Sequence, residues 1–184
     1  MFPDNRTVNY GMIIGVSSTK KTGKSTFIND FKQNWPAYQS PETDFRDLNL
    51  DLVNDKARDR QVDNPELSPQ ERQGKILDFM LEYLKAGYDR EKNVIHDLTT
   101  IDNLAYTIFL KRRYPDLVTD EFVAESFAKV KESTHYYDII VFIPVVPNAD
   151  VKPSDIPDGI DMTARTEIDE ILKALYSAYH CNPD

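Results

Sequence analysis

Three features are scarce in this sequence of 184 residues, and each scarcity excludes a class of protein. Its one cysteine, Cys181, excludes an internal disulfide. It has no apolar run near the roughly 20 residues of a membrane span, and its first ten residues do not resemble a secretory signal. Positive charge is also short, because 22 Lys and Arg face 31 Asp and Glu for a net charge of −9. This balance disfavours non-specific binding to nucleic acids or anionic membranes, so we expect a soluble cytoplasmic protein.

Hydrophobic residues nevertheless make up 40% of the chain, which is enough for a core, and we expect a single domain over residues 1–184. Short β-branched runs alternate with segments of helical periodicity, and residues 138–144 form the clearest buried strand. Ser68, Pro69 and Glu71 have the pattern of a helix start. We predict strands at residues 12–16, 37–40, 93–98 and 138–144, and helices at 25–35, 68–87, 99–114, 119–134 and 162–180. This alternation predicts an α/β fold with a parallel sheet of about five strands and helices on both faces.

Residues 15–26 read GVSSTKKTGKST and follow the first predicted strand. They match a phosphate-binding loop, G-x-x-x-x-G-K-[ST], except that Ser18 stands at the first glycine position. Serine is small and can hydrogen-bond within its own turn, so we expect the loop to keep its form. The alternative is a lysine-rich turn, but a strand before and a helix after favour the nucleotide site. The predicted nucleotide-binding residues are Ser18, Thr19, Lys20, Lys21, Thr22, Gly23, Lys24, Ser25 and Thr26.

A site of this kind needs an acid at the end of a neighbouring strand to organise the metal. Asp97 lies at the carboxyl end of the predicted strand at residues 93–98, whereas the strand at 138–144 ends in proline. We therefore predict that Ser25 and Asp97 bind Mg²⁺, that Lys24 reaches the β- and γ-phosphates, and that Asp97 also takes the proton of an attacking hydroxyl. The alternative is that Asp97 only caps the following helix, but Thr99 or Thr100 can serve as that cap.

With the loop and the stretch HDLTTIDNLAY (residues 96–106) both present, the chain resembles the P-loop kinases of nucleosides and nucleotides. It is most similar to the group that contains the kinase domain of the bifunctional nicotinamide riboside kinase/adenylyltransferase and many phage kinases. The resemblance runs over residues 12–179 and also includes PETDFR (residues 41–46) and YYDIIVFIP (residues 136–144). It implies a P-loop three-layer sandwich with a lid-like segment at residues 111–135. The polar and charged composition of residues 48–69 separately predicts a surface insertion.

By this resemblance, four residues would bind the acceptor: Glu42, Arg46, Asp102 and Tyr106. Arg112 and Arg113 would act as lid arginines that clamp the transferring phosphate; the alternative for this pair is a solvated helix end whose cations suit the helix dipole. Arg165 is a further candidate for a nucleotide contact. The chain departs from the family pattern at Leu98 and Asp161, where the family often has arginines, and this makes the acceptor the uncertain part of the prediction.

We therefore predict an ATP- and Mg²⁺-dependent kinase that transfers the γ-phosphoryl group to a nucleoside, a nucleotide or a similar small hydroxyl acceptor. One alternative is a kinase of a hydroxymethylated base in DNA, which the acidic charge disfavours. The other is a nucleotide-binding regulatory ATPase with little turnover. A nucleotide and a small-molecule acceptor are the expected partners, a membrane is not, and a homodimer is left open.

Overall fold

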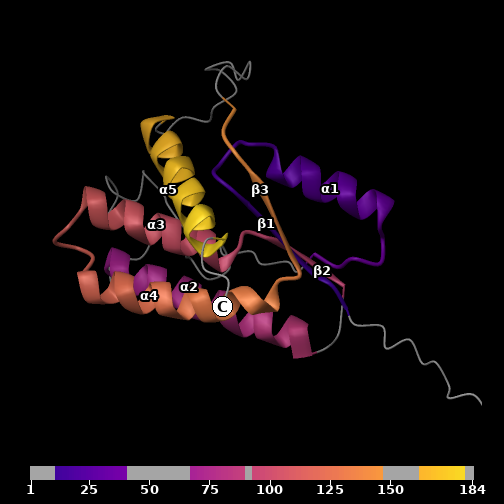
Figure 1. Cartoon of the computed structure of the whole chain (residues 1–184), viewed down its shortest axis with the longest axis horizontal. Helices are drawn as coiled ribbons and strands as arrows, with labels where there is room; N and C mark the ends of the chain where they lie inside the picture. Colours follow the sequence, from indigo (N-terminus) through magenta and orange to yellow (C-terminus); the bar gives the residue numbers. More distant parts are fainter. Residues whose placement is uncertain (1–10, 41–66, 90–92, 147–161, 181–184) are drawn as a thin grey trace, which may run out of the picture.

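The computed structural model describes residues 11–40, 67–89, 93–146 and 162–180 (Figure 1). Helices and strands alternate through most of this part of the chain, as the sequence predicts. The strands are β1 (Ile13–Ser18), β2 (Val94–Asp97) and β3 (Ile139–Ile143). The helices are α1 (Lys24–Asn34), α2 (Pro69–Asp89), α3 (Thr100–Arg113), α4 (Asp120–Ser133) and α5 (Met162–His180), with the 3-10 turn η2 (Thr134–Tyr136) between α4 and β3.

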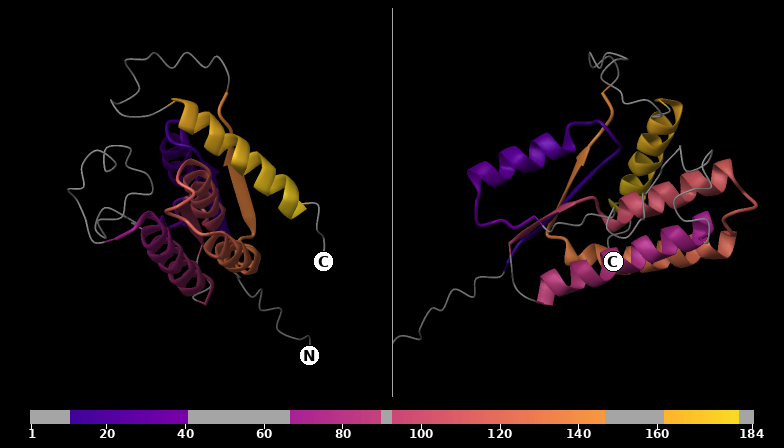
Figure 2. Two further views of the ribbon diagram at one scale, coloured as in Figure 1. Left: turned by 90° about the vertical axis from the view of Figure 1, so that its left-hand side faces the viewer. Right: turned by 180° about the vertical axis from the view of Figure 1, so that it is seen from behind.

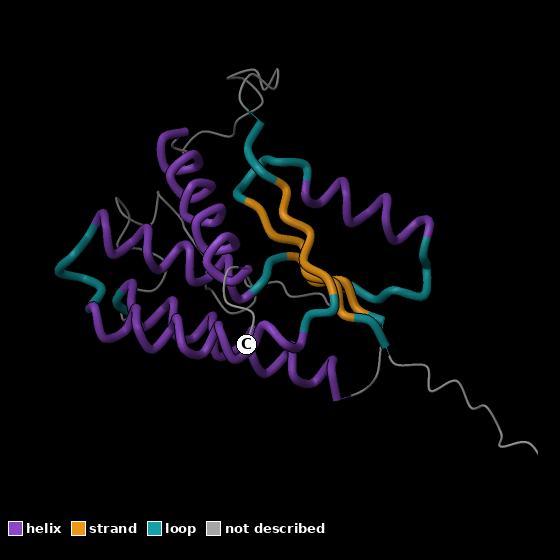
Figure 3. The backbone as a smooth tube through the Cα atoms, in the orientation of Figure 1, coloured by secondary structure: helices purple, strands orange, loops and turns teal. Residues whose placement is uncertain are grey.

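The sheet is parallel and has the strand order β2-β1-β3, with β1 at its centre (Figure 3). In this register Val16 of β1 lies beside Asp97, and Ser18 lies beside Ile143. The carboxyl ends of the strands therefore meet at one edge, where parallel α/β sheets bind their ligands. The described residues form three strands rather than about five, and the strand predicted at residues 37–40 is reduced to a single bridge between Gln39 and Val94.

The strand at residues 138–144 was predicted to be the clearest buried strand, and this prediction is wrong. All six residues of β1 are buried, whereas each residue of β3 is partly or fully exposed. Ile139 is the most exposed of them, with 46% of its surface accessible. Within the described residues β3 pairs only with β1, so it is an edge strand, although its apolar side chains pack on both faces of the sheet.

Helices cover both faces of the sheet (Figure 2). On one face α1 packs Ile28, with Phe27 and Phe31 beside it, against Ile14 and Val16 of β1. On the other face a larger core joins α3 and α5 to α2 and α4, and Ile140 and Phe142 of β3 pack against it. This arrangement is the three-layer α/β sandwich that the sequence predicts.

The helix starts follow the sequence closely. Ser68 and Glu71 form the predicted reciprocal cap, in which the Ser68 N–H donates to Glu71 Oε2 at 2.8 Å and the Glu71 N–H donates to Ser68 Oγ at 3.2 Å. The backbone hydrogen bond from Ser68 lowers the pKa of the Glu71 carboxyl. Most of the predicted insertion, residues 48–66, lies outside the described residues. None of the described helices combines the length and the apolar character needed to cross a membrane.

Candidate functional site

The chain between β1 and α1 has the geometry of an anion-binding loop. β1 ends at Ser18, α1 begins at Lys24, and Gly23 between them has a left-handed backbone with φ of 92°. Glycine adopts this conformation without a steric penalty, which explains its place before the lysine. No side chain caps the first N–H groups of α1, so they and the helix dipole remain directed at the loop.

Ser18 fits the loop because its position makes no demand that only glycine can meet. Its backbone is not among the described residues with positive φ, which apart from Gly23 are Lys21 and Leu98. The side chain is 1% exposed, and its hydroxyl donates to the Thr19 carbonyl at 3.1 Å. The serine thus closes a local turn within the loop, as the sequence predicts.

Lys24 and Asp97 meet across the edge of the sheet. Lys24 Nζ forms an ion pair and a hydrogen bond with Asp97 Oδ1, with the lysine side chain 14% exposed and the aspartate 41% exposed. Lys24 opens α1, and Asp97 ends β2 beside Val16 in the parallel register. Two residues 73 positions apart in the sequence are therefore brought together by the strand order.

The oxygen atoms needed for a magnesium site lie on the same elements. Ser25 is exposed in the first turn of α1, and Asp97 is partly open to solvent. Among the described residues there is no group of three or more His, Cys, Asp or Glu that could hold a metal ion. Mg²⁺ bound with a nucleotide usually takes only one or two protein ligands besides phosphate and water, so a hydroxyl and a carboxylate suit it.

Asp102, predicted to contact an acceptor, is fully buried at the start of α3. Oδ1 accepts from Ser17 Oγ at 2.9 Å and from the Ser18 N–H at 3.1 Å. Oδ2 accepts from the Thr99 N–H at 2.7 Å and from Thr99 Oγ1 at 2.8 Å. Burial raises the pKa of this carboxyl to about 6, although hydrogen bonds from Thr99 and the charge of Lys24 oppose the rise. The predicted contact between Asp102 and an acceptor stays a prediction. The hydrogen bonds described here join its carboxylate to Ser17, Ser18 and Thr99.

The turn between Asp97 and Thr99 is constrained on both sides. Leu98 has φ of 83°, a left-handed backbone that a leucine adopts at a cost of roughly 1 kcal/mol. Its N–H donates to the Val16 carbonyl at 3.0 Å, which fixes the turn to β1. Thr99 then caps α3 in a capping box with Asp102, as one of the two cap residues expected from the sequence.

Two tyrosines complete the polar cluster at the start of α3, and no sequence pattern predicted their position there. Tyr137 accepts from the Thr100 N–H at 3.2 Å, and the Tyr176 hydroxyl lies 3.4 Å from Thr99 Oγ1. Burial raises the pKa of both phenols, so both are neutral at physiological pH. The T-x-x-D spacing of Thr99 and Asp102 is a capping-box pattern and could have revealed the role of Asp102.

Arg165, on α5, is 6% exposed and lies against the loop, where its Nη2 donates to the Lys21 carbonyl at 3.1 Å. Its Nε is buried without a hydrogen-bond partner, and the described residues offer it no ion-pair partner. A buried guanidinium is normally paired with an anion. The structure thus brings together Lys24, Asp97 and Arg165 around the loop.

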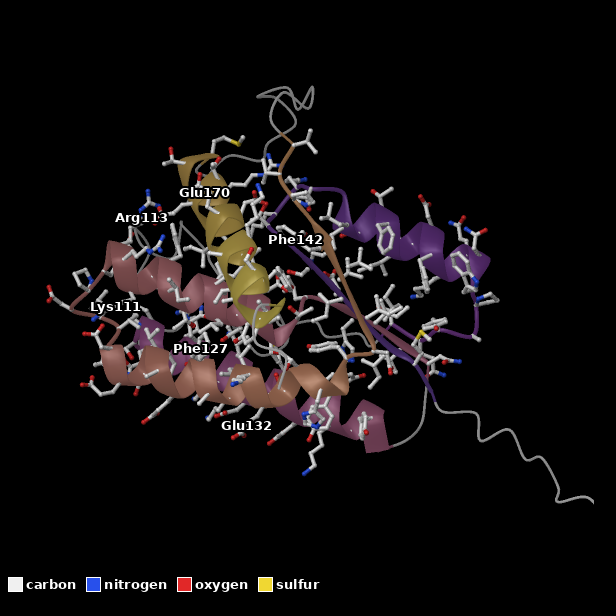
Figure 4. The ribbon with its side chains drawn as sticks, viewed as in Figure 1. Lys111, Arg113, Phe127, Glu132, Phe142 and Glu170 are labelled. Carbon is white, nitrogen blue, oxygen red and sulfur yellow. The ribbon has the colours of Figure 1, made fainter. Side chains whose placement is uncertain are left out.

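Among the residues that the structure describes, three other predicted site residues lie apart from this group. Arg112 and Arg113 occupy the last turn of α3, and at about 1.5 Å per residue Arg113 lies roughly 20 Å along the helix from Thr100. Figure 4 labels Arg113 at this end of α3. The Arg113 guanidinium stacks over the Phe109 ring with its Cζ 5.2 Å from the ring centroid. Tyr106 is 4% exposed in the core between α3 and α5. Glu42, Arg46 and Asp161 lie outside the described residues.

A cavity of about 1440 Å³ opens elsewhere, between α2, α4, α5 and β3. Its lining includes Phe127 and Glu132 of α4 and Phe142 of β3, which Figure 4 labels. None of the predicted site residues lines it. The lining also includes Tyr176, whose hydroxyl lies near Thr99 in the polar cluster at the start of α3.

Comparison with known proteins shows likeness in structure but not in sequence. No protein-family model matches the chain, and no curated protein sequence matches it. It is similar to the structure of NadR protein in complex with NAD and AMP-PNP, with a TM-score of 0.58 and 13% identity over 94% of this chain and 42% of that one. It is also similar to deoxyadenosine kinase from M. mycoides with bound dATP, with a TM-score of 0.50 and 17% identity over 90% of this chain and 84% of that one.

These likenesses concern the fold, which the chain shares with both proteins, and they confirm the predicted α/β fold class. The chain spans less than half of the length of the NadR protein chain that it matches. At this level of identity, activity and substrate do not transfer with the fold.

Proposed function

We propose that this protein is a P-loop kinase that uses ATP and Mg²⁺ to phosphorylate a nucleoside, a nucleotide or a similar small hydroxyl acceptor. The observation that carries the proposal is the pairing of Lys24 with Asp97 at the carboxyl edge of the sheet. The two structural neighbours support it, because one is a kinase with bound dATP and the other is a protein in complex with NAD and AMP-PNP.

In this proposal the loop and Lys24 hold the phosphates of the donor. The backbone N–H groups around Gly23 and the start of α1 face the anion, and the Lys24 ammonium neutralises charge on the β- and γ-phosphates. Arg165 adds a second cation, because its buried guanidinium lies against the loop and has unused hydrogen-bonding capacity at Nε. The remaining predicted loop contacts, from Ser18 to Thr26, belong to the same proposal.

Asp97 is the proposed base. The acceptor hydroxyl gives its proton to the Asp97 carboxylate as its oxygen attacks the γ-phosphorus, and the bond from that phosphorus to the β-phosphate oxygen breaks to release ADP. Lys24 must leave its ion pair with Asp97 to reach the phosphates, so donor binding also frees the base. Ser25 and Asp97 would hold Mg²⁺, which supplies positive charge to the phosphates.

The acceptor residues follow from the family resemblance and stay proposals. Glu42 and Arg46 would line the acceptor pocket with Asp102 and Tyr106, and Arg112 and Arg113 would close over the phosphates as a lid. Such a lid requires a movement that brings the last turn of α3 toward the loop. A homodimer and a cytoplasmic location likewise stay predictions.

The test is transfer of labelled γ-phosphate from ATP, with Mg²⁺, to a panel of nucleosides, nucleotides, nicotinamide riboside and DNA that contains hydroxymethylated bases. Label on a small acceptor supports the proposal, and label only on DNA supports the modified-base alternative. Tight ATP binding without transfer to any acceptor favours a regulatory ATPase and overturns the proposal.

Substitution of the loop lysine tests the site assignment. Lys24→Ala removes the cation that balances the transferring phosphate, so we expect transfer to fall by about 100-fold or more. Lys32→Ala is the matched control, because Lys32 lies in the last turn of the same helix. Transfer that persists in Lys24→Ala, in a protein with unchanged circular dichroism, would show that the site lies elsewhere.

A further inference from the structure

The Asp102 carboxylate joins two chain segments that the proposed site needs side by side. One oxygen holds Ser17 and Ser18, where β1 passes into the loop. The other oxygen holds Thr99, two residues after Asp97. The side chain is 0% exposed, so water does not compete for these bonds.

The first of these bonds reaches the loop itself. The last residue of β1 is Ser18, and its backbone N–H donates a hydrogen bond to Asp102 Oδ1. The hydroxyl of Ser17, also fully buried, adds a second contact to the same oxygen. The start of the loop is therefore tied to α3, which follows Asp97, as well as to its own strand.

The second pair of bonds fixes the turn after Asp97. Leu98 holds a left-handed conformation that is costly for leucine, and such a conformation persists only where its surroundings enforce it. Two contacts enforce it here, the Leu98 N–H to Val16 and the Thr99 N–H to Asp102. Loss of the second contact would let the turn relax and move Asp97.

We propose that Asp102 is a positioning residue that sets the phosphate loop and Asp97 at their working separation. It acts through Ser18 and Thr99, and this role requires no contact with the donor or the acceptor. This proposal rests on the proposed function only for the expected effect on ATP binding. The tether, meaning the hydrogen bonds of Asp102 to Ser17, Ser18 and Thr99, is a property of the folded chain.

The choice of a carboxylate over an amide follows from its partners. All four donors point at the two oxygens, and two of these donors are backbone N–H groups, of Ser18 and Thr99. An asparagine has one oxygen, so whichever way its amide turns, one of the two N–H groups faces an NH₂ group. A buried donor without an acceptor is costly, so that segment must move away.

The test compares Asp102→Asn with the unchanged protein by amide hydrogen exchange of the peptide that spans the loop, followed by mass spectrometry, without nucleotide. We expect exchange in residues 15–26 and around Thr99 to become at least tenfold faster, while β3 exchanges as before. Exchange of the loop within twofold of the unchanged protein would overturn the proposal.

A matched control separates positioning from general loss of stability. Asn103 is the next residue on α3 and is equally buried, but its Nδ2 donates to the Gln73 side chain of α2 at 2.9 Å. Asn103→Ala should lower the unfolding temperature without faster exchange in the loop. If both variants accelerate loop exchange equally, Asp102 has only a structural role.

A milder variant keeps the test informative if Asp102→Asn does not fold. Ser17→Ala removes one donor to the same oxygen with little change in volume. We expect it to accelerate exchange of the loop by about twofold to fivefold and to leave α2 unchanged. Unaltered exchange at Ser18 in this variant would count against the tether.

ATP binding distinguishes failure of this inference from failure of the proposed function. In Asp102→Asn we expect the dissociation constant for ATP with Mg²⁺ to rise about tenfold while the protein stays folded. ATP affinity within twofold of the unchanged protein, together with faster loop exchange, would refute a role in nucleotide binding. If the unchanged protein does not bind ATP, the proposed function fails, and hydrogen exchange alone decides whether Asp102 holds the loop.

Discussion

Replacement of His96 should change how the stability of this protein depends on pH. His96 lies on β2 and is 7% exposed, and its Nε2 has no hydrogen-bond partner among the described residues. Burial lowers the pKa of His96 from 6.5 to about 4. The groups that face it are the rings of Tyr83 and Tyr137, with centroids at 5.9 and 6.2 Å, and neither ring provides a charge that would stabilise the imidazolium.

The size of the effect follows from the two pKa values. Between pH 6.5 and about 4 the unfolded chain binds a proton at this histidine and the folded chain does not, so the free energy of unfolding falls as the pH falls. The pKa values differ by about 2.5, and at about 1.36 kcal/mol per pH unit the folded state loses about 3 kcal/mol across this window.

The variant His96→Phe removes the titration and keeps a flat ring between the two tyrosines. Denaturant unfolding followed by circular dichroism, at half-unit steps from pH 7.5 to 4, gives the difference in unfolding free energy between variant and unchanged protein. Any packing effect of the larger ring adds a constant offset. We expect the difference to move in favour of the variant by about 3 kcal/mol as the pH falls. A flat difference, or one of opposite slope, would refute the reasoning.

Asp102 provides a comparison of opposite sign in nearly the same window. Its pKa is raised from 3.8 to about 6, so its contribution to stability is complete below pH 3.8 and is lost as the pH rises through 6. The two groups therefore offset each other, and the curve of the unchanged protein alone will look flatter than either. As the pH falls, the difference in unfolding free energy between variant and unchanged protein should move in favour of the variant for His96→Phe and against the variant for Asp102→Asn.

Two further substitutions test the packing around the site by the same unfolding measurement. Gly15→Ala would place a Cβ 2.6 Å from Thr99 Cγ2 and 3.0 Å from the Tyr137 ring, so we expect a loss of about 1–3 kcal/mol; a loss under about 0.5 would show that these groups yield easily. Thr119→Ala removes the cap of α4, where Thr119 Oγ1 accepts from the Phe122 N–H at 3.1 Å, and should cost about 1 kcal/mol. Thr119→Ser should retain most of that stability, and an equal loss in both variants would contradict the cap.

Local sequence signals predicted the parts of this protein that depend on local physics. The loop and the first turn of α1 follow from Gly23 and Lys24, whose conformation and charge the motif already specifies. The start of α2 follows from Ser68 and Glu71, which satisfy each other within one turn. The position of Asp97 followed from one further rule, that parallel strands present their carboxyl ends at a common edge.

The features that the sequence did not predict depend on neighbours that no local pattern encodes. Residues 138–144 are as apolar as a central strand, but their burial depends on how many strands lie beside them. The family resemblance predicts that Asp102 binds the acceptor, but the sequence does not show that its carboxylate is surrounded by Ser17 and Ser18, about 85 positions away. The lid role of Arg112 and Arg113 stays a prediction, because a sequence does not say whether the last turn of α3 moves toward the loop.

If the proposed function holds, the ion pair between Lys24 and Asp97 makes the affinity for a nucleotide a difference between two electrostatic contacts. Without nucleotide the lysine already has an anionic partner, so an incoming phosphate replaces a carboxylate rather than meeting a bare charge. Added salt screens the contact that is lost as well as the contact that is gained. The affinity for ATP should therefore vary less with ionic strength than that of a loop whose lysine has no partner, and Asp97→Asn should steepen this dependence.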